Sequence, residues 1–171
     1  MIPRLETERL ILRGMIEADI VEEQAFLATD RAAFVGGPMH KFDVWRYCAS
    51  LMGHWKFRGF GLFAIEEKVT GRYLGRAGPW FPQDWPEPEI GWTMMANAEG
   101  KGFAREAAEA ARAWAYTEKN LDKMISLIDP ANTRSIALAE RLGAKFECEF
   151  EHFKFGTMSI WRHPSKAELG L

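Results

Sequence analysis

The chain has 171 residues, 47% of them hydrophobic, and this length suits one domain over residues 1–171 rather than two. Its net charge of −2 at pH 7 gives no overall attraction to nucleic acid, so we expect no nucleic-acid partner. The sequence has no membrane-length apolar run and no cleavable leader, which predicts a cytoplasmic protein without a membrane partner. Two distant cysteines and four histidines without ligand spacing predict neither a disulfide framework nor a metal site.

The first third of the chain has the pattern of a short strand followed by two helices. Residues 10–12 are apolar and end before a glycine, as a strand would. Apolar residues recur at helical spacing over residues 15–29, and a second helix is predicted over residues 42–58. The expected buried side of the second helix consists of Trp45, Cys48, Ala49, Met52 and Trp55 or Lys56.

The middle of the chain predicts a hairpin and then a stiff loop. Residues 61–67 and 73–78 have the composition of strands joined by a turn. Residues 79–88 contain too many prolines for a helix or an inner strand, so we expect a surface loop there. Its aromatic residues either pack on one another or line a binding pocket, and these alternatives stay open.

A glycine-rich turn at residues 97–105 lies between a strand-like run (89–95) and an alanine-rich helical run (106–116). Glycine relaxes the limits on backbone conformation, so successive N–H groups can converge on one point. The start of the next helix adds unpaired N–H groups and the positive end of its dipole. Lys101 and Arg105 bring further positive charge. The turn therefore predicts a phosphate-binding site.

Two familiar phosphate loops do not fit this turn. A Walker A loop requires Ser or Thr after its lysine, whereas Gly102 and Phe103 follow Lys101. A dinucleotide fingerprint requires a small residue three positions after its second glycine, and that position holds Arg105.

The last third of the chain predicts a buried strand, a helix and a final strand pair. Residues 123–129 form the strand, which Pro130 ends. The helix runs from Asn132 to residue 142, and Gly143 suits its C-terminal cap. The final strands are expected at residues 146–150 and 153–161, with His152 near their junction.

Three motifs in this sequence resemble those of the GNAT superfamily of N-acetyltransferases. The string Asn97-Ala98-Glu99-Gly100-Lys101-Gly102 is similar to the acyl-CoA loop Arg/Gln-x-x-Gly-x-Gly/Ala, although Asn97 departs from its first position. The string Asn132-x-x-Ser135, followed by Ala-Glu-Arg-Leu-Gly at residues 139–143, resembles the second signature, in the expected order and spacing. The opening Leu-Glu-Thr-Glu-Arg-Leu-Ile-Leu-Arg resembles the branch that includes the ribosomal-protein alanine acetyltransferases (RimJ/RimL-like).

This resemblance implies a fold and an activity. The fold would be mixed α/β (α+β), with a mostly antiparallel twisted sheet of about seven strands flanked by helices and splayed at the acyl-CoA site. The activity would be direct transfer of an acetyl group from acetyl-CoA, the co-substrate, to a primary amine of a protein N-terminus or a small molecule. The alternative is a catalytically silent acetyl-CoA sensor, because Asn97 departs from the motif and the second-signature helix lacks a tyrosine. A homodimer is also expected, since homodimers are common in the family.

The resemblance also assigns cofactor-binding residues. A bulge in the strand before the loop would free the N–H of Met94 or Met95 to hold the acyl and pantetheine end. The side chain of Asn132 would bind the pantetheine arm, since a carboxamide both donates and accepts. The loop amides that would hold the pyrophosphate belong to Glu99, Gly100, Lys101, Gly102, Phe103, Ala104 and Arg105.

Two catalytic roles follow from the same resemblance. Ser135 is the candidate acid that protonates the thiolate, although a serine at this position also suits a helix cap. Glu89 is the leading candidate base, acting directly or through water, and positioning without any base is the alternative. The rival bases are Glu149, Glu151 and His152, and the side chains expected near the acceptor are His40, Trp45 and His54.

Overall fold

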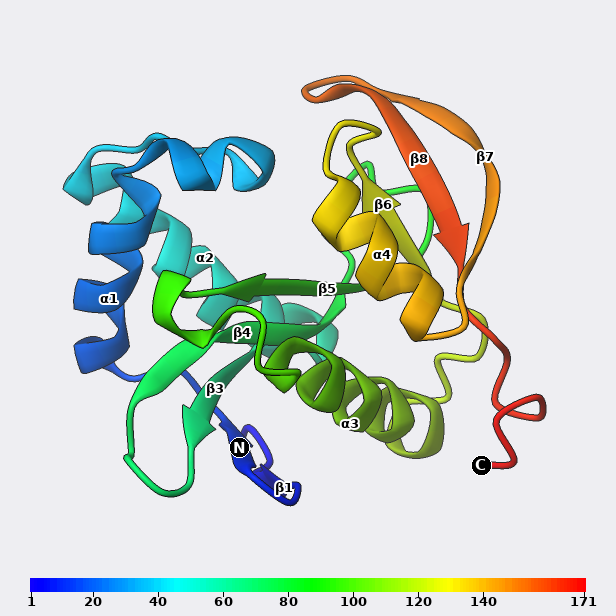
Figure 1. The fold of residues 1–171 in the computed structure, drawn as a ribbon, viewed down its shortest axis with the longest axis horizontal. Coiled ribbons are helices and arrows are strands. Elements are labelled where there is room, and N and C mark those ends of the chain that lie inside the picture. The colour runs from blue at the N-terminus through cyan, green and yellow to red at the C-terminus, as the bar shows by residue number, and fades with distance from the viewer.

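The computed structural model describes residues 1–171 and shows one eight-stranded sheet flanked by helices (Figure 1). The strand order is β1-β2-β3-β4-β5-β6-β8-β7, and every pair is antiparallel except β5 with β6. The strands are β1 (Leu5–Glu6), β2 (Leu10–Arg13), β3 (Phe63–Glu67), β4 (Tyr73–Trp80), β5 (Glu89–Met94), β6 (Ile125–Ile128), β7 (Lys145–His152) and β8 (Gly156–Arg162). The helices are α1 (Glu17–Leu27), η1 (Asp30–Val35), α2 (Lys41–Arg58), η2 (Ala96–Ala98), α3 (Phe103–Glu118) and α4 (Thr133–Arg141). The expected mixed fold is confirmed, and the sheet has eight strands rather than about seven.

Helix α3 forms the main core with the sheet. It lies in front of the strands in Figure 1 and packs on β2, β4 and β5, whereas α2 lies behind them. Its buried side carries alanines whose small side chains let the helix axis approach the strands closely. These fully buried residues are Ala107, Ala108, Ala111 and Ala115. This close packing holds the start of α3 in a fixed position beside the end of β5.

The buried face predicted for α2 was wrong in part. Cys48 and Trp55 are buried as expected, but Trp45 is 56% exposed and Met52 is 39% exposed. The buried face instead includes Val44 and Leu51, which lie on the adjacent side of the helix. Helical spacing alone allowed both faces, because apolar residues occupy both.

Strand β4 continues two residues into the segment that was predicted to be a loop. Pro79 pairs with Ile90 and Trp80 pairs with Glu89. The N–H of Met95 donates to the Leu74 carbonyl over 2.8 Å, so the odd-numbered residues of β5 carry the hydrogen bonds to β4. Ile90 is even-numbered, and its backbone faces away from Pro79. Proline fits inside this strand because no N–H is needed at that position.

Strands β5 and β6 are the point at which the sheet opens. They pair only at Glu89 and Ile125, whereas the other edge of β6 pairs with β8 along its whole length. Side chains satisfy the backbone groups that this divergence leaves unpaired. The Ser126 hydroxyl donates to the Ile90 carbonyl over 2.6 Å, and the Leu127 N–H donates to Glu89 Oε2 over 3.1 Å. The splay is therefore a built feature of the sheet rather than a packing defect.

Candidate active site

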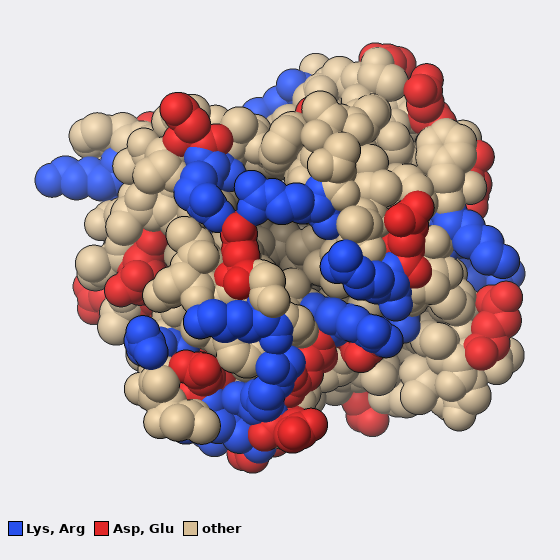
Figure 2. All heavy atoms as spheres, viewed as in Figure 1, with Lys and Arg blue, Asp and Glu red and all other residues tan.

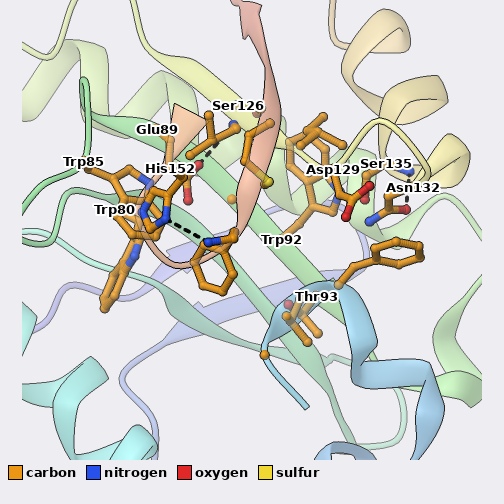
Figure 3. Close-up of a pocket in the computed structure, with 18 of the residues that line it drawn as sticks. Trp80, Trp85, Glu89, Trp92, Thr93, Ser126, Asp129, Asn132, Ser135 and His152 are labelled. Carbon is orange, nitrogen blue, oxygen red and sulfur yellow. Dashed lines mark hydrogen bonds between the residues drawn. The ribbon is translucent and has the colours of Figure 1, made fainter. Parts of the chain in front are cut away.

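A cavity of about 640 Å³ opens where β5 and β6 diverge. In Figure 3 its labelled side chains form two groups separated by Trp92. We call the first group the aromatic end, comprising Trp80, Trp85, Glu89 and His152, and the second group the α4 end, comprising Asp129, Asn132 and Ser135. The two candidate catalytic residues, Glu89 and Ser135, thus line one cavity from opposite ends.

The glycine turn before α3 has the geometry of an anion site. Gly100 and Gly102 adopt φ of 73° and 80°, a left-handed conformation that favours glycine. No N–H group from Glu99 to Arg105 donates a hydrogen bond to another protein atom. Seven consecutive N–H groups, next to the positive end of the α3 dipole, are therefore available to a phosphate. This arrangement fits the diphosphate of coenzyme A.

Basic side chains surround this turn. Figure 2 shows Lys and Arg residues gathered around a hollow on the face that carries α3 and α4. Glu99 accepts from Arg31 of η1 over 2.6 Å and from Arg134 of α4 over 2.5 Å. The Glu99 carboxylate thereby holds two guanidinium groups, one from η1 and one from α4, close to the turn. Both arginines are exposed, and they add to the local attraction for an anion.

The backbone of β5 differs from the expectation in one respect. Its register with β4 is continuous, so the predicted bulge is absent from this pair. The register shift lies on the other side of β4, between Ile65 and Glu66 of the β3 pairing. Of the two candidate donors, Met95 already donates to Leu74, while the N–H of Met94 faces the splay by alternation. An extended ligand in the splay would meet the N–H of Met94 without any bulge.

Asn132 and Ser135 are fixed by the start of α4. Asn132 is the N-cap residue, and its Oδ1 accepts from the Ser135 N–H over 3.2 Å. This bond orients the Asn132 side chain and leaves its NH₂ group free to donate. Both residues line the cavity and are half-buried.

Glu89 has the environment of a proton acceptor. Its half-buried side chain lines the cavity, and desolvation raises its pKa to about 7. The Leu127 N–H and the indole N–H of Trp85 oppose this rise in pKa. A carboxylate with a pKa near neutrality accepts protons far more efficiently than an ordinary glutamate. Of the rival bases, Glu149 and Glu151 are exposed and lie outside the cavity wall, whereas His152 lines it.

A serine–histidine pair at the cavity does not have the geometry of a nucleophile and its base. Ser126 Oγ lies 2.9 Å from His163 Nε2, but Arg112 Nη1 lies 2.9 Å from His163 Nδ1. An arginine donates only, so Nδ1 must accept and the proton of the neutral ring lies on Nε2. Burial and Arg112 lower the pKa of His163 to about 3, which keeps the ring neutral. His163 therefore donates to Ser126 and takes no proton from it.

The comparisons with known proteins agree with this geometry. The family model described as "Acetyltransferase (GNAT) domain" matches residues 9–145. The chain belongs to the GNAT acetyltransferase family.

Individual proteins and solved structures are also similar to this GNAT chain. The YkkB protein of Bacillus subtilis (strain 168) is 31% identical over 147 residues, covering 84% of this chain and 86% of that protein. An acetyltransferase of Agrobacterium tumefaciens is 34% identical in sequence, with a TM-score of 0.87 and 95% of each chain covered. The ribosomal alpha-N-protein acetyltransferase RimL, in complex with coenzyme A, shares the fold at 13% identity and a TM-score of 0.72, covering 95% of this chain and 98% of that one.

The GNAT enzyme is thus an acetyl-CoA-dependent N-acetyltransferase. When bound, acetyl-CoA supplies the activated acetyl group. The free N–H groups of the glycine turn, the outward N–H of Met94 and the carboxamide of Asn132 are the protein groups that would hold it.

Sequence reasoning missed several residues of the GNAT site and misplaced others. His40, Trp45 and His54 do not line the cavity. His54 is instead held by the Phe60 carbonyl and the Phe81 N–H, and stacks on Trp80. The missed cavity residues include Trp92, Asp129 and Ser126, and the position of the first on alternating β5 was the only signal available for it.

Proposed function

We propose that this GNAT enzyme transfers the acetyl group directly to a primary amine, either at a protein N-terminus or on a small molecule. The observation that carries the proposal is that Glu89, a carboxylate with a pKa of about 7, and the residues at the start of α4 line the same cavity. A base at one end and a polar helix start at the other match the two requirements of aminolysis. These are a neutral attacking amine and a stabilised leaving group.

In this proposal each end of the cavity has its own task. Glu89 removes the proton from the acceptor ammonium, directly or through one water molecule, at Oε1 or Oε2. Ser135 Oγ supplies a proton to the leaving thiolate. The N–H groups from Glu99 to Arg105 anchor the pyrophosphate, and Asn132 and Met94 orient the arm that leads to the reacting centre.

Direct transfer is favoured over a cysteine-linked intermediate. Cys48 is buried away from the cavity, and burial raises the pKa of its thiol to about 11, so it is protonated near neutral pH. Cys148 is exposed on β7 and does not line the cavity. A covalent step would therefore lack a placed nucleophile, since Ser126 faces a donating histidine.

The alternative function is an acetyl-CoA sensor with no turnover. Mixing the purified protein with acetyl-CoA and a panel of primary amines, and measuring free thiol, separates the two. We expect thiol release that depends on both the amine and the protein. Binding of coenzyme A by calorimetry without thiol release from any amine would favour the sensor.

We also propose that the enzyme belongs to the branch of the ribosomal-protein alanine acetyltransferases. The opening segment around residues 5–13 and the shared fold of RimL support this assignment.

None of the helices combines the length and the apolar composition that a membrane-spanning helix requires. A homodimer is proposed as well, and exposed aromatic residues such as Phe42 and Trp45 on α2 would suit an interface.

A further inference from the structure

The parallel pairing of β5 with β6 stops one step earlier than the two strands would allow. The Ile125 N–H donates to the Pro88 carbonyl over 3.1 Å, as in a regular parallel ladder. Two residues further along each strand, the same bond would join the Leu127 N–H to the Ile90 carbonyl. That bond would add a second residue pair to the ladder, and no second pair forms. A donor and an acceptor that suit each other are therefore kept apart.

Two side chains take the place of this missing bond. The Leu127 N–H donates to Glu89 Oε2 over 3.1 Å, and the Ile90 carbonyl accepts from the Ser126 hydroxyl over 2.6 Å. Ser126 and Glu89 both line the cavity (Figure 3). The candidate base thus holds one half of an interrupted ladder bond, and a serine holds the other half.

The Ser126 hydroxyl is oriented by a buried chain of hydrogen bonds. Arg112 Nη1 lies 2.9 Å from His163 Nδ1 and can only donate to it, so His163 carries its proton on Nε2. That N–H donates to Ser126 Oγ over 2.9 Å. The single proton of the hydroxyl is then directed to the Ile90 carbonyl. The three side chains are at most 5% exposed, so solvent does not compete for these bonds.

The chain keeps this direction at the pH of the reaction. Burial, with Arg112 nearby, lowers the pKa of His163 to about 3, so the ring stays neutral and its Nδ1 stays an acceptor. Arg112 also donates to the carbonyl of Leu142, the C-cap residue of α4, over 2.7 Å. The negative end of the α4 dipole favours a cation there, although Arg112 forms no ion pair.

The arrangement decides how the Glu89 carboxylate lies. Its Oε2 is held by the Leu127 N–H, whereas its Oε1 lies on the side of Gly91, 3.5 Å from the position of an added Cβ. Gly91 lines the cavity, so Oε1 lies at the cavity wall. Without the serine hydroxyl, the Ile90 carbonyl would be a buried acceptor without a partner, and the nearest ladder donor is the Leu127 N–H. Glu89 would then lose the donor that orients it.

From this geometry we propose that Ser126, oriented by His163, is a positioning residue for Glu89. Its hydroxyl occupies the Ile90 carbonyl, so that the Leu127 N–H stays hydrogen-bonded to the Glu89 carboxylate. The inference rests on the proposed role of Glu89 as proton acceptor. Ser126 exchanges no proton with either substrate and acts through Glu89 alone.

The kinetic test compares Ser126→Ala, which removes the hydroxyl, with Ser126→Thr, which retains one. In the alanine variant Glu89 loses a donor that lowers its pKa, so the pKa should rise. The acidic limb of the kcat–pH profile should therefore move to higher pH. At pH 7 kcat should fall roughly tenfold, as the loss of one buried hydrogen bond predicts, with the KM for acetyl-CoA unchanged. Ser126→Thr should restore both the rate and the profile.

Ser159→Ala is the matched control. Ser159 is also buried and lies on the neighbouring strand β8, opposite Ile128, but it does not line the cavity. Its substitution removes the same group from the sheet and should leave kcat and its pH profile as in wild type. A merely structural role for Ser126 would lower stability without moving the acidic limb. An unmoved limb in Ser126→Ala, or an equal movement in Ser159→Ala, would overturn the inference.

Hydrogen-bond couplings measured by NMR test the geometry without turnover. In wild type and in Ser126→Thr, the Leu127 ¹⁵N should couple to the side-chain carboxyl carbon of Glu89. In Ser126→Ala it should couple to the carbonyl carbon of Ile90 instead. Coupling to the same carbon in wild type and in Ser126→Ala would overturn the inference. Absence of thiol release from every amine would refute the proposed function, and the couplings would still decide whether Ser126 positions Glu89.

Discussion

The glycine turn and the aromatic end offer different kinds of groups to a ligand. The turn offers main-chain N–H groups from seven consecutive residues, none of which donates a hydrogen bond within the protein. The aromatic end offers side chains from β4, the 81–88 loop, β5 and the end of β7, which are far apart in the sequence. A site made of backbone is specified locally, whereas a site made of side chains depends on how the whole sheet is assembled.

This contrast explains why the cofactor is better defined than the acceptor. The turn keeps its geometry as long as Gly100 and Gly102 retain their positive φ. The aromatic end changes whenever a loop residue changes, because loops tolerate substitution. We therefore expect variants of the glycine turn to change the affinity for the cofactor, and variants of the aromatic end to change the use of the acceptor.

The largest effect is expected from the buried ion pair between β4 and α1. Arg76 lines the cavity, is 1% exposed, and pairs with Glu23, which also accepts from the Tyr73 hydroxyl over 2.5 Å. Glu23→Ala leaves a guanidinium buried without its counter-charge and should lower the free energy of unfolding by roughly 3–5 kcal/mol. Urea denaturation followed by tryptophan fluorescence measures this loss.

The exposed pair of Arg4 and Glu6 provides the control for that measurement. Glu6→Gln should leave the urea midpoint unchanged, because solvent screens this pair. A midpoint for Glu23→Ala equal to that of wild type would show that the cavity wall does not depend on the Arg76–Glu23 pair.

The next effect concerns catalysis at the aromatic end. Glu89→Gln should reduce kcat roughly a hundredfold, the lower range for losing a general base, while coenzyme A affinity is retained. Below pH 7 the wild-type carboxylate becomes protonated and loses its capacity to accept a proton, because its pKa is about 7. The ratio of wild-type to variant kcat should therefore fall toward lower pH and level off above pH 7.

Stopped-time thiol assays between pH 6 and pH 9 measure this ratio. The acceptor amine titrates equally in both proteins and cancels. A ratio that does not vary with pH would argue that positioning of the substrates alone accounts for the rate enhancement and that Glu89 accepts no proton in the reaction.

The sequence predicted the parts of this molecule that depend on local pattern. The order of strands and helices, the turn between β5 and α3, and a helix that starts near Asn132 all follow from residues close together in the chain, although the N-cap is Asn132 rather than Ser135. The environment of Glu89 could not be predicted in this way. Its raised pKa arises from burial in the splay and is partly opposed by the Leu127 N–H, 38 positions along the chain.

The errors have the same physical origin. Pro79 was placed in a loop because its missing N–H disfavours a strand, but the register with β5 makes that N–H unnecessary. Trp45 was assigned to a buried stripe because its spacing allowed it, and only the packing of α1 and β4 decides which stripe is buried. The pairing of Trp85 with His152 joins positions 67 residues apart and has no local signal.

A smaller effect is expected at the glycine turn. Gly102 has φ of 80°, and an added Cβ would lie 3.4 Å from Arg9 Nη2. Gly102→Ala should shift this conformation, misdirect the neighbouring N–H groups and raise the Kd for coenzyme A roughly tenfold, since the left-handed region costs other residues about 1–2 kcal/mol. Titration calorimetry measures the affinity, and kcat at saturating acetyl-CoA should change little.

Gly71→Ala is the control for backbone strain. Gly71 has φ of 68° in the turn between β3 and β4, with no atom near its added Cβ. Its substitution carries a similar conformational cost away from the turn before α3 and should leave coenzyme A affinity unchanged. Equal losses of affinity in the two variants would mean that general destabilisation, rather than the loop amides, controls binding.

The smallest effect is expected at the α4 end of the cavity. Ser135→Ala removes the hydroxyl but keeps the backbone N–H that Asn132 Oδ1 accepts, so the start of α4 should persist. Because a thiolate is a good leaving group, its protonation contributes modestly, and kcat should fall about fivefold. An unchanged KM for acetyl-CoA together with this fall would identify a role at the leaving sulfur. An unchanged kcat would instead leave Ser135 as a first-turn residue of α4, and the start of α4 would then contribute only by orienting Asn132.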